Sequence, residues 1–334
     1  MKPLILTCFL TPEFLQPNLA DIAIFPYFEF VGEPLPSPDE LAAYLGSRTS
    51  SGGPRSGGHW SDFSGYWDRS ENKDYRDLSL AEFCQQYEAV ELWFDTRPKS
   101  QLQLIWLLDY FRSYPGAVAR LKLRLLRFDL IGVPTGGLGD ERPPLVDVTN
   151  KELATAHSAW EAYCATTPAS CFAELGKDLS ALPLLRPVLL ELLNELPSAT
   201  TGLGATEIRM LELIGRGYSL TNALFHLESL RQTRVFDQWH LGYLLDGLAF
   251  GPKPAISGLD EALRTISREN LRDRQTAYQR SELSLTDFGK AILAHREDFS
   301  RHNPIDRWWG GSHLTNDNLW RYDPVLLPPA KWRT

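Results

Sequence analysis

The sequence is poor in sulfur-containing residues, with 4 Cys and 2 Met among 334 residues. The cysteines form no Cys-x-x-Cys pair, and no histidines lie at zinc-like spacing beside them; they are Cys8, Cys84, Cys164 and Cys171. This scatter argues against a disulfide framework and against a structural zinc finger. We therefore expect reduced, buried thiols, and we expect neither a metal nor a cofactor.

Long hydrophobic runs are also missing. The N-terminal stretch MKPLILTCFLTPEF offers only about seven apolar-rich residues before Pro12 and Glu13, too few for a membrane span. It also lacks the small-residue cleavage site of a signal peptide. The sequence thus predicts no membrane association and a bacterial-type cytoplasmic location.

An excess of basic charge is absent as well. The formal net charge is -8 and the pI is about 5.5, so the molecule repels polyanions and could bind nucleic acid only through a local basic patch. Nucleophile motifs are missing too, because GGSHL lacks the closing glycine of GxSxG and no HExxH occurs. The sequence therefore leaves open whether the protein is an enzyme.

Short apolar runs alternating with a helical pattern are present in the first part of the chain. An amphipathic stretch beginning at Gln101 repeats apolar residues at helical spacing until Pro115 and Gly116. Four runs bounded by turn formers indicate buried strands: 3–9, 21–25, 89–95 and 121–133. We predict an α/β domain with a mostly parallel sheet over residues 1–148.

A Gly- and Ser-rich insertion at about 47–77 separates the second predicted strand from the third. It carries four aromatic residues that a plain linker would lack: Trp60, Phe63, Tyr66 and Trp67. One interpretation is a surface loop fixed by its rings. The other is a lid over the carboxyl edge of the sheet, where open α/β sheets bind ligands.

The second part of the chain changes to helix formers. We predict a helical connector over 149–198 and a domain over 199–301 with three amphipathic helices, two short strands and a closing helix capped by Thr286. Three helices followed by a strand pair predict a mainly α, winged-helix-like domain. Residues 302–334 would form a docking tail.

The third of these helices is unsuited to a phosphate-rich groove. Its stretch FDQWHLGYLLDGLAF contains no Lys or Arg, and residues 201–300 hold 12 basic and 13 acidic residues, so 12 − 13 = −1. This balance favours a protein-interaction or structural role over DNA binding.

One arginine series is the exception to this balance. Arg264, Arg268 and Arg272 recur every four residues and would align to grip phosphates if their segment were helical. Acidic residues three or four positions earlier offer the alternative, an internally paired solvated face.

Polar side chains at the predicted sheet edge suggest a ligand site. Asp95 ends its strand, and the carboxyl ends of parallel strands face the ligand crevice. Glu91 shares its face of the strand, so a carboxylate pair could hold a metal or act as a general base. Only Asp95 lies at the edge itself, however, which argues against metal-dependent hydrolysis and favours capping and hydrogen-bonding roles for Gln101 and Gln103 beside it.

The stretch NPIDRWWGGSHLTNDNLWRYDP, residues 303–324, gathers large rings and opposite charges around a double glycine. One hypothesis is a clasp in which the rings supply buried area and the charge pairs fix the register. The rival is a pocket in which Arg307, His313 and Arg321 hold an anionic ligand.

These motifs resemble an uncharacterised bacterial family of two-part proteins, known as domains of unknown function. The similar segments are ELWFDTRPKSQLQLIWLLDYF, PYFEFVGEPLP, GLGD, LPSATTGLGATE, LTDFGKAIL, IDRWWGGSHL and WRYD. The resemblance implies an N-terminal α/β domain joined to a helical C-terminal part. Where family members carry Asn-Gly-Asp and Trp-Phe-Glu-His-Asp, this chain has 7–9 Thr-Cys-Phe and 93–97 Trp-Phe-Asp-Thr-Arg, so the family's acidic edge is reduced here.

Two functional hypotheses follow. The first is non-enzymatic recognition of a protein or nucleic acid, in regulation, through the winged-helix-like domain. The second is an enzyme or sensor for a small phosphorylated or nucleotide-like ligand at the sheet edge, using Asp95 and Gln101 with Arg307 or His313 from a tail that folds back to the α/β domain.

Overall fold

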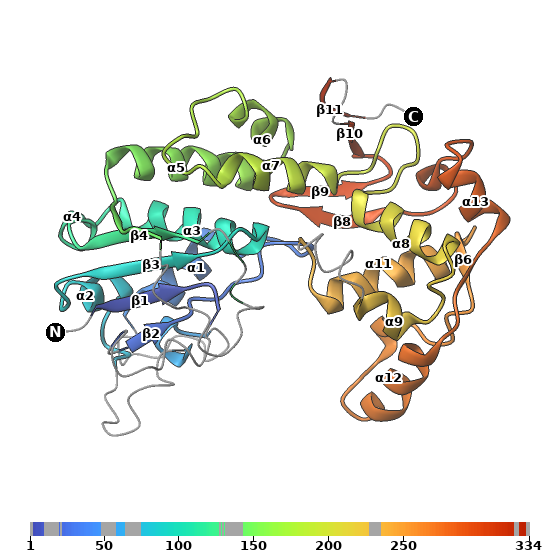
Figure 1. Ribbon diagram of the computed structural model, residues 1–334, viewed down its shortest axis with the longest axis horizontal. Helices are drawn as coiled ribbons and strands as arrows, with labels where there is room; N and C mark the ends of the chain where they lie inside the picture. The colour runs from blue at the N-terminus through green and yellow to red at the C-terminus, as the bar shows by residue number, and fades with distance from the viewer. Residues whose placement is uncertain are drawn as a thin grey trace. The chain divides into compact units, whose positions relative to one another are not determined.

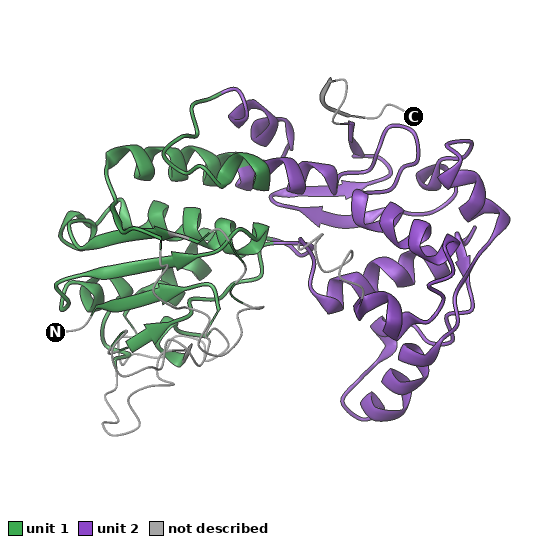
Figure 2. Cartoon of the chain, in the orientation of Figure 1, with its two compact units in different colours: residues 1–30, 35–162, 177–188 green, residues 31–34, 163–176, 189–334 purple. Residues whose placement is uncertain are grey.

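The computed structural model describes residues 3–9, 20, 22–47, 58–63, 75–126, 128, 130, 143–226, 235–323 and 327–331. The chain divides into two compact units (Figure 2). Unit 1 comprises Met1–Phe30, Leu35–Ala162 and Lys177–Val188, and unit 2 comprises Val31–Pro34, Tyr163–Gly176 and Leu189–Thr334. The segment 149–198, expected as a connector, is thus shared between the units, and the predicted tail belongs to unit 2.

A five-stranded sheet forms the centre of unit 1 (Figure 1). The four predicted strands pair in parallel, and a short fifth strand that was not predicted pairs antiparallel with β4. The order is β2-β1-β3-β4-β5, with bounds Leu4–Thr7 (β1), Ile22–Ile24 (β2), Val90–Phe94 (β3), Leu121–Leu125 (β4) and Val146–Asp147 (β5). Strands β1 to β3 are buried along their whole length, which explains their continuous apolar sequence.

The carboxyl ends of β1 and β3 lie side by side. Their register pairs Leu4 with Val90 and Thr7 with Trp93. Chain order reverses at this point, because β2 lies on one side of β1 whereas β3 and β4 follow on the other. Such a reversal of strand order is a topological switch point in an open α/β sheet.

Helix α3, Pro98–Phe111, is the main helix of unit 1 and is buried on nearly every side. Trp106 on α3 packs against Phe28 and Phe30, with ring centroids 5.6 and 5.3 Å apart, and Phe30 in turn packs against Trp160 at 5.0 Å. The other helices are α1 Pro38–Leu45, η2 Trp60–Phe63, α2 Leu80–Cys84 and α4 Pro115–Val118. The predicted helix is confirmed, and it begins three residues earlier than its apolar repeat.

The insertion is held down by one of its rings. Trp60 is fully buried, donates Nε1–H to the Leu78 carbonyl at 3.0 Å and packs against Phe83. Tyr66 and Trp67 lie outside the described residues. The described part therefore shows an anchored loop.

Three helices follow the sheet: α5 Asn150–Cys164, α6 Ala169–Glu174 and α7 Leu185–Asn194. The first and third were predicted, whereas α6 was not. In unit 1, the His157 ring on α5 hydrogen-bonds Asp109 on α3 at 2.8 Å.

Unit 2 contains the three further helices that the sequence predicts, α8 Ala205–Gly215, α9 Thr221–His226 and α11 Gln238–Phe250. They are followed by β6 Ile256–Ser257, η4 Leu263–Thr265, α12 Leu271–Arg280, β7 Ser284–Leu285, α13 Asp287–Leu293 and η5 Phe299–Arg301. Strands β6 and β7 pair antiparallel, and Thr286 caps α13 by accepting the Gly289 N–H at 3.1 Å, as predicted. A bridge between Leu220 and Glu282 adds a third extended segment.

The tail forms strands that the sequence did not predict. A hairpin joins β8 Asp306–Trp309 to β9 Ser312–Thr315, and β10 Trp320–Asp323 pairs with β11 Leu327–Lys331. The hairpin turns at Gly310, where φ is +52°, and a Cβ there would collide with the Tyr163 carbonyl. Glycine at this position thus allows both the left-handed backbone and the close approach.

Candidate functional site

Asp95 lies at the end of β3, fully buried and completely hydrogen-bonded. Its oxygens accept the Arg97 backbone N–H at 3.1 Å, the Arg97 Nε and Nη2 at 2.8 and 2.7 Å, and the Leu130 N–H at 3.0 Å. A carboxylate with this many internal donors has little capacity left for a ligand. Its environment is that of a structural ion pair.

Gln101 lies beside Asp95, as the sequence analysis expected. Its side-chain Nε2 donates to the Asp95 carbonyl at 2.6 Å, and the Asp95 N–H donates to Ser100 Oγ at 2.9 Å. Ser100 and Gln101 both come from the first turn and a half of α3. The bonds tie the end of β3 to the start of that helix.

Cys8 follows β1 at the same sheet edge. Arg97 Nη2 lies 3.7 Å from its sulfur. Burial, reinforced by the Asp95 charge, raises the pKa of the Cys8 thiol to about 11. The thiol is therefore protonated at neutral pH and is unsuited to act as a nucleophile.

Glu91 and Asp95 do not form a shared carboxylate pair. Glu91 Oε2 accepts Trp93 Nε1 at 2.8 Å and Arg124 Nη2 at 3.1 Å, while the Arg124 guanidinium lies 4.7 Å from the Trp93 ring centroid. Each carboxylate is thus bound by its own arginine. The metal or general-base arrangement considered from the sequence has no counterpart here.

Arg321 is a buried fastening of the tail within unit 2. Its Nη1 donates to the Ser198 carbonyl at 2.7 Å, and its Nη2 binds Asp298 at 2.8 Å and Ser300 Oγ at 2.6 Å. Trp309 Nε1 donates to the Leu192 carbonyl at 2.6 Å. A buried ring and a buried ion pair fit the clasp hypothesis, although the partner of Arg321 shown here, Asp298, is not the sequence neighbour that the hypothesis named.

The predicted pocket residues of the tail do not converge. Within the hairpin, Arg307 is paired with Leu314 and His313 with Trp308, so Arg307 and His313 project to opposite faces. His313 stacks on the Trp308 ring at 4.5 Å and its Nε2 binds the Asp306 carboxylate at 2.7 Å.

Arg307 instead contacts the start of α8. Its Nη1 binds Glu207 at 2.7 Å, and Glu207 also accepts the Gly204 N–H at 2.8 Å as a helix cap. Glu195 lies in the same charge cluster and accepts both the N–H and the hydroxyl of Thr206. Burial raises the pKa of Glu195 to about 7.

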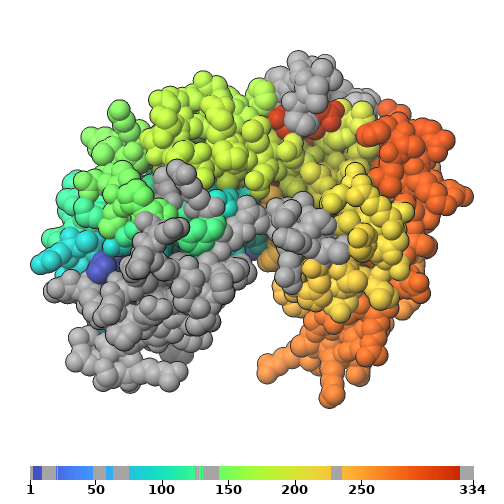
Figure 3. Space-filling view, in the orientation of Figure 1, coloured from blue at the N-terminus to red at the C-terminus, as the bar shows by residue number. Residues whose placement is uncertain are grey.

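Arg264, Arg268 and Arg272 do not form the stripe that a single helix would give. Arg264 lies in η4, with its guanidinium 5.4 Å from the Tyr243 ring centroid, whereas Arg272 lies in α12. Arg268 lies in the turn between these two elements, so the segment is not one continuous helix. All three are exposed, and Figure 3 shows the orange region around α12 protruding from the rest of unit 2.

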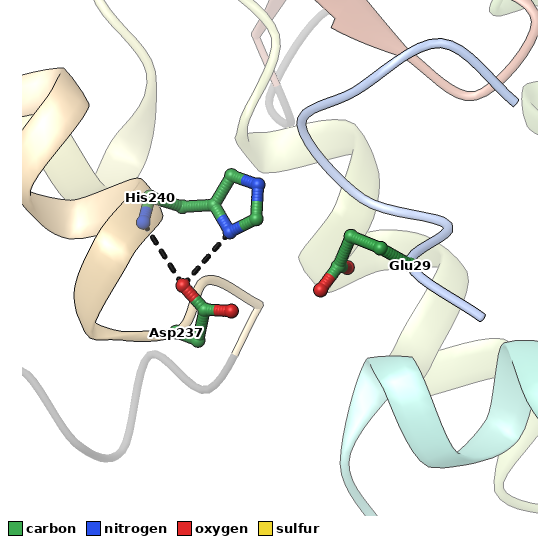
Figure 4. A group of neighbouring side chains, drawn as sticks. All are labelled: Glu29, Asp237 and His240. Carbon is green, nitrogen blue, oxygen red and sulfur yellow. Dashed lines mark hydrogen bonds and ion pairs between the residues drawn. The ribbon is translucent and has the colours of Figure 1, made fainter. Parts of the chain in front are cut away.

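The start of α11 carries a residue that sequence reasoning missed. Asp237 Oδ1 accepts both the backbone N–H and the ring Nδ1–H of His240, at 2.9 and 2.8 Å (Figure 4). His240 is buried, although it lies beside Trp239, whose exposed fraction is 49%. The Glu29 carboxylate, also drawn in Figure 4, belongs to unit 1 and binds Lys99 there at 2.7 Å.

Comparison of the chain with models of known protein families gave no match, and a search of curated proteins found none either. Among the described residues, no helix combines the length and the apolar character that crossing a bilayer requires.

Proposed function

We propose that unit 2 is a winged-helix module that recognises another protein through the start of α11. The order α8, α9, α11, β6 and β7 supports the winged-helix assignment. So does the bridge between Leu220 and Glu282, which adds the short strand that such modules form between their first two helices. In this arrangement α11 occupies the place of the recognition helix.

The observation that carries the proposal is the exposure of Trp239. Its side chain is 49% exposed in the first turn of α11, next to the exposed Gln238. Tryptophan is enriched among the residues that dominate binding energy in protein interfaces. The helix carries no basic residue, so its surface suits a protein partner better than DNA.

Charge defines the chemistry of the partner. Asp237 and Glu33, at the same end of α11, have side chains that are 39% and 58% exposed. A complementary partner therefore presents an apolar pocket for Trp239, flanked by Lys or Arg. The net charge of -8 also favours a positively charged partner at long range.

Selection of a phage-displayed random peptide library on the full-length protein tests this proposal. We expect enriched peptides that combine apolar and basic residues and that bind Trp239→Ala at least about 30-fold more weakly, as a hot-spot residue implies. The matched control is Tyr218→Ala, because Tyr218 is 45% exposed elsewhere in unit 2. Peptides that bind both variants and the unchanged protein equally would contradict the proposal.

Binding to mixed-sequence duplex DNA, measured across a salt titration, tests the competing function. We expect no salt-dependent binding. If the protein bound DNA and the triple variant Arg264→Ala, Arg268→Ala, Arg272→Ala reduced the salt slope by about one per arginine, unit 2 would be a DNA-binding module instead.

One observation keeps a second candidate, an enzyme or sensor for a small phosphorylated or nucleotide-like ligand at the sheet edge of unit 1. Chain order reverses between β1 and β3, which is where doubly wound sheets bind such ligands. A ligand there would stabilise the folded state by RT ln(1 + [L]/Kd), so the melting temperature would rise with the logarithm of the ligand concentration once it exceeds Kd. A thermal-shift series with inorganic phosphate, ADP and ATP that shows no rise would remove this candidate.

A further inference from the structure

We propose that unit 2 binds a divalent first-row metal ion, with zinc as its type, through His240 Nε2 and the Glu33 carboxylate. Asp237 orients the imidazole and does not touch the metal. The site lies at the start of α11 and does not rest on the exposure of Trp239, although its carboxylates, Asp237 and Glu33, also supply the negative charge of the proposed protein-recognition surface.

Asp237 fixes the tautomer of His240. Its carboxylate accepts the ring Nδ1–H at 2.8 Å, so in the neutral imidazole the lone pair lies on Nε2. Histidines that bind metals nearly always donate their other ring nitrogen to a carboxylate or a carbonyl in this way. The Asp237–His240 pair therefore has the preorganisation of a metal ligand.

The Nε2 atom lacks the partner that a structural histidine would have. The His240 side chain is only 9% exposed, and Nε2 is itself buried, with no hydrogen-bond partner among the described residues. Buried polar atoms in native proteins are normally paired, since an unpaired one costs about 1–3 kcal/mol. A metal ion would satisfy this nitrogen.

The backbone before Glu33 holds that residue next to the imidazole. Gly32 forms an antiparallel bridge with Trp308 and has a φ of +84°. A Cβ on Gly32 would lie 2.5 Å from His240 Cδ2 and 3.0 Å from Nε2, so only glycine permits this approach. The following residue, Glu33, consequently places its Oε1 3.9 Å from Nε2.

This separation suits two ligands of one ion. Zinc bonds to imidazole and carboxylate measure about 2.1 Å, which puts two tetrahedral ligand atoms about 3.4 Å apart. Glu33 is 58% exposed and can rotate to close the difference from 3.9 Å. Imidazole with carboxylate is a donor set that zinc accepts, and water would fill the remaining positions.

His313 offers a matched control in the same unit. It also pairs with a carboxylate, Asp306, but it does so through Nε2, its ring stacks on Trp308 and its side chain is 43% exposed. It therefore shares the residue types of the proposed site without the buried, unpaired nitrogen.

Calorimetric titration of the metal-stripped full-length protein with Zn²⁺ tests the proposal. We expect one zinc ion per chain, and binding at least about 10-fold weaker in His240→Asn and in Glu33→Gln, by analogy with the losses known for altered metal shells. The Asn variant retains a donor for Asp237, so a melting curve without metal shows whether the fold is preserved. His313→Asn and Cys164→Ser should bind zinc as the unchanged protein does.

Replacing zinc with Co²⁺ gives a spectroscopic readout. We expect visible d–d absorption that is lost in His240→Asn and kept in His313→Asn. Absence of zinc binding, or equal binding by folded His240→Asn, would overturn the proposal. Loss of binding in Cys164→Ser would assign the metal to the exposed thiol instead, and would overturn it as well.

Discussion

The sheet edge of unit 1 and the start of α11 in unit 2 place carboxylates in comparable positions with different results. Asp95 precedes α3 and is bound by the guanidinium and backbone of Arg97, whereas Asp237 caps α11 and is bound by His240. At the sheet edge, Arg97 Nε and Nη2 both bind the Asp95 carboxylate, which completes an ion pair. At α11 the partner keeps one buried nitrogen unpaired among the described residues. The comparison teaches that burial of a charge alone does not mark a ligand-binding site, but burial together with an unpaired hydrogen-bonding atom does.

The largest expected effect is at Asp95, whose carboxylate is hydrogen-bonded by Arg97 and Leu130. Asp95→Ala removes a buried acceptor of the Arg97 guanidinium and of the Arg97 and Leu130 backbone N–H groups, and should lower the free energy of unfolding by about 3–5 kcal/mol, measured by urea denaturation. Zinc binding should be unchanged in the fraction that remains folded. Lys290→Ala is the control, because Lys290 and Asp287 form an exposed pair whose loss should cost less than about 1 kcal/mol. A loss at Asp95 as small as this control would show that the sheet edge is not held by its ion pair.

The pH dependence of the free energy of unfolding extends the comparison to a further buried carboxylate, that of Glu195. Burial raises the pKa of Glu195 to about 7 in the folded protein from a usual value of 4.5. Below the usual value, Glu195 is protonated in both states, so its burial carries no ionisation penalty. As the pH rises from about 4.5 to 7, the unfolded chain releases this proton first, and stability falls by about 3 kcal/mol before levelling off.

The variant Glu195→Gln isolates this contribution. The difference in unfolding free energy between Glu195→Gln and the unchanged protein should grow across that pH range, as measured by urea denaturation. A pH-independent difference would mean that the pKa of Glu195 is not raised in the folded state, because Arg307 and the Thr206 donors offset the effect of burial on its carboxylate.

Strands β1 to β3 could be predicted from the sequence because they are buried along their whole length and therefore appear as largely apolar runs. The tail strands could not, because they are short and mix large rings with charges, as in 306–309 and 320–323. The β8–β9 hairpin forms at a glycine turn that packs against the Tyr163 carbonyl, far away in sequence. Had the hairpin been predicted, its period of two would have separated Arg307 from His313.

Spacing alone also misled at the arginine series. Arg264, Arg268 and Arg272 are four residues apart, but the Ser267 N–H donates to Asn270 Oδ1 at 2.7 Å, and α12 begins only at Leu271. A local side-chain bond thus replaced the helical hydrogen bonds that the spacing assumed.

The candidate site at α11 was predictable only in part. Asp237 three residues before His240 is a recognisable helix-start pattern, because Asp is a favoured N-cap. The unpaired state of Nε2 was not recognisable, because it depends on Gly32 and Glu33, which the fold brings to the helix from the first tenth of the chain. A lone histidine in an apolar helix therefore gives little signal by itself.

The smallest expected effect on stability separates capping from metal binding. Asn caps a helix as well as Asp does, so Asp237→Asn should change the free energy of unfolding by less than about 0.5 kcal/mol. The same change makes the acceptor of the His240 Nδ1–H neutral, which should weaken zinc binding by about 10–100-fold. Calorimetry and urea denaturation on one preparation measure both quantities. If Asp237→Asn bound zinc as tightly as the unchanged protein, Asp237 would act only as a helix cap. The start of α11 would then resemble the sheet edge at Asp95, where the carboxylate has only a structural role.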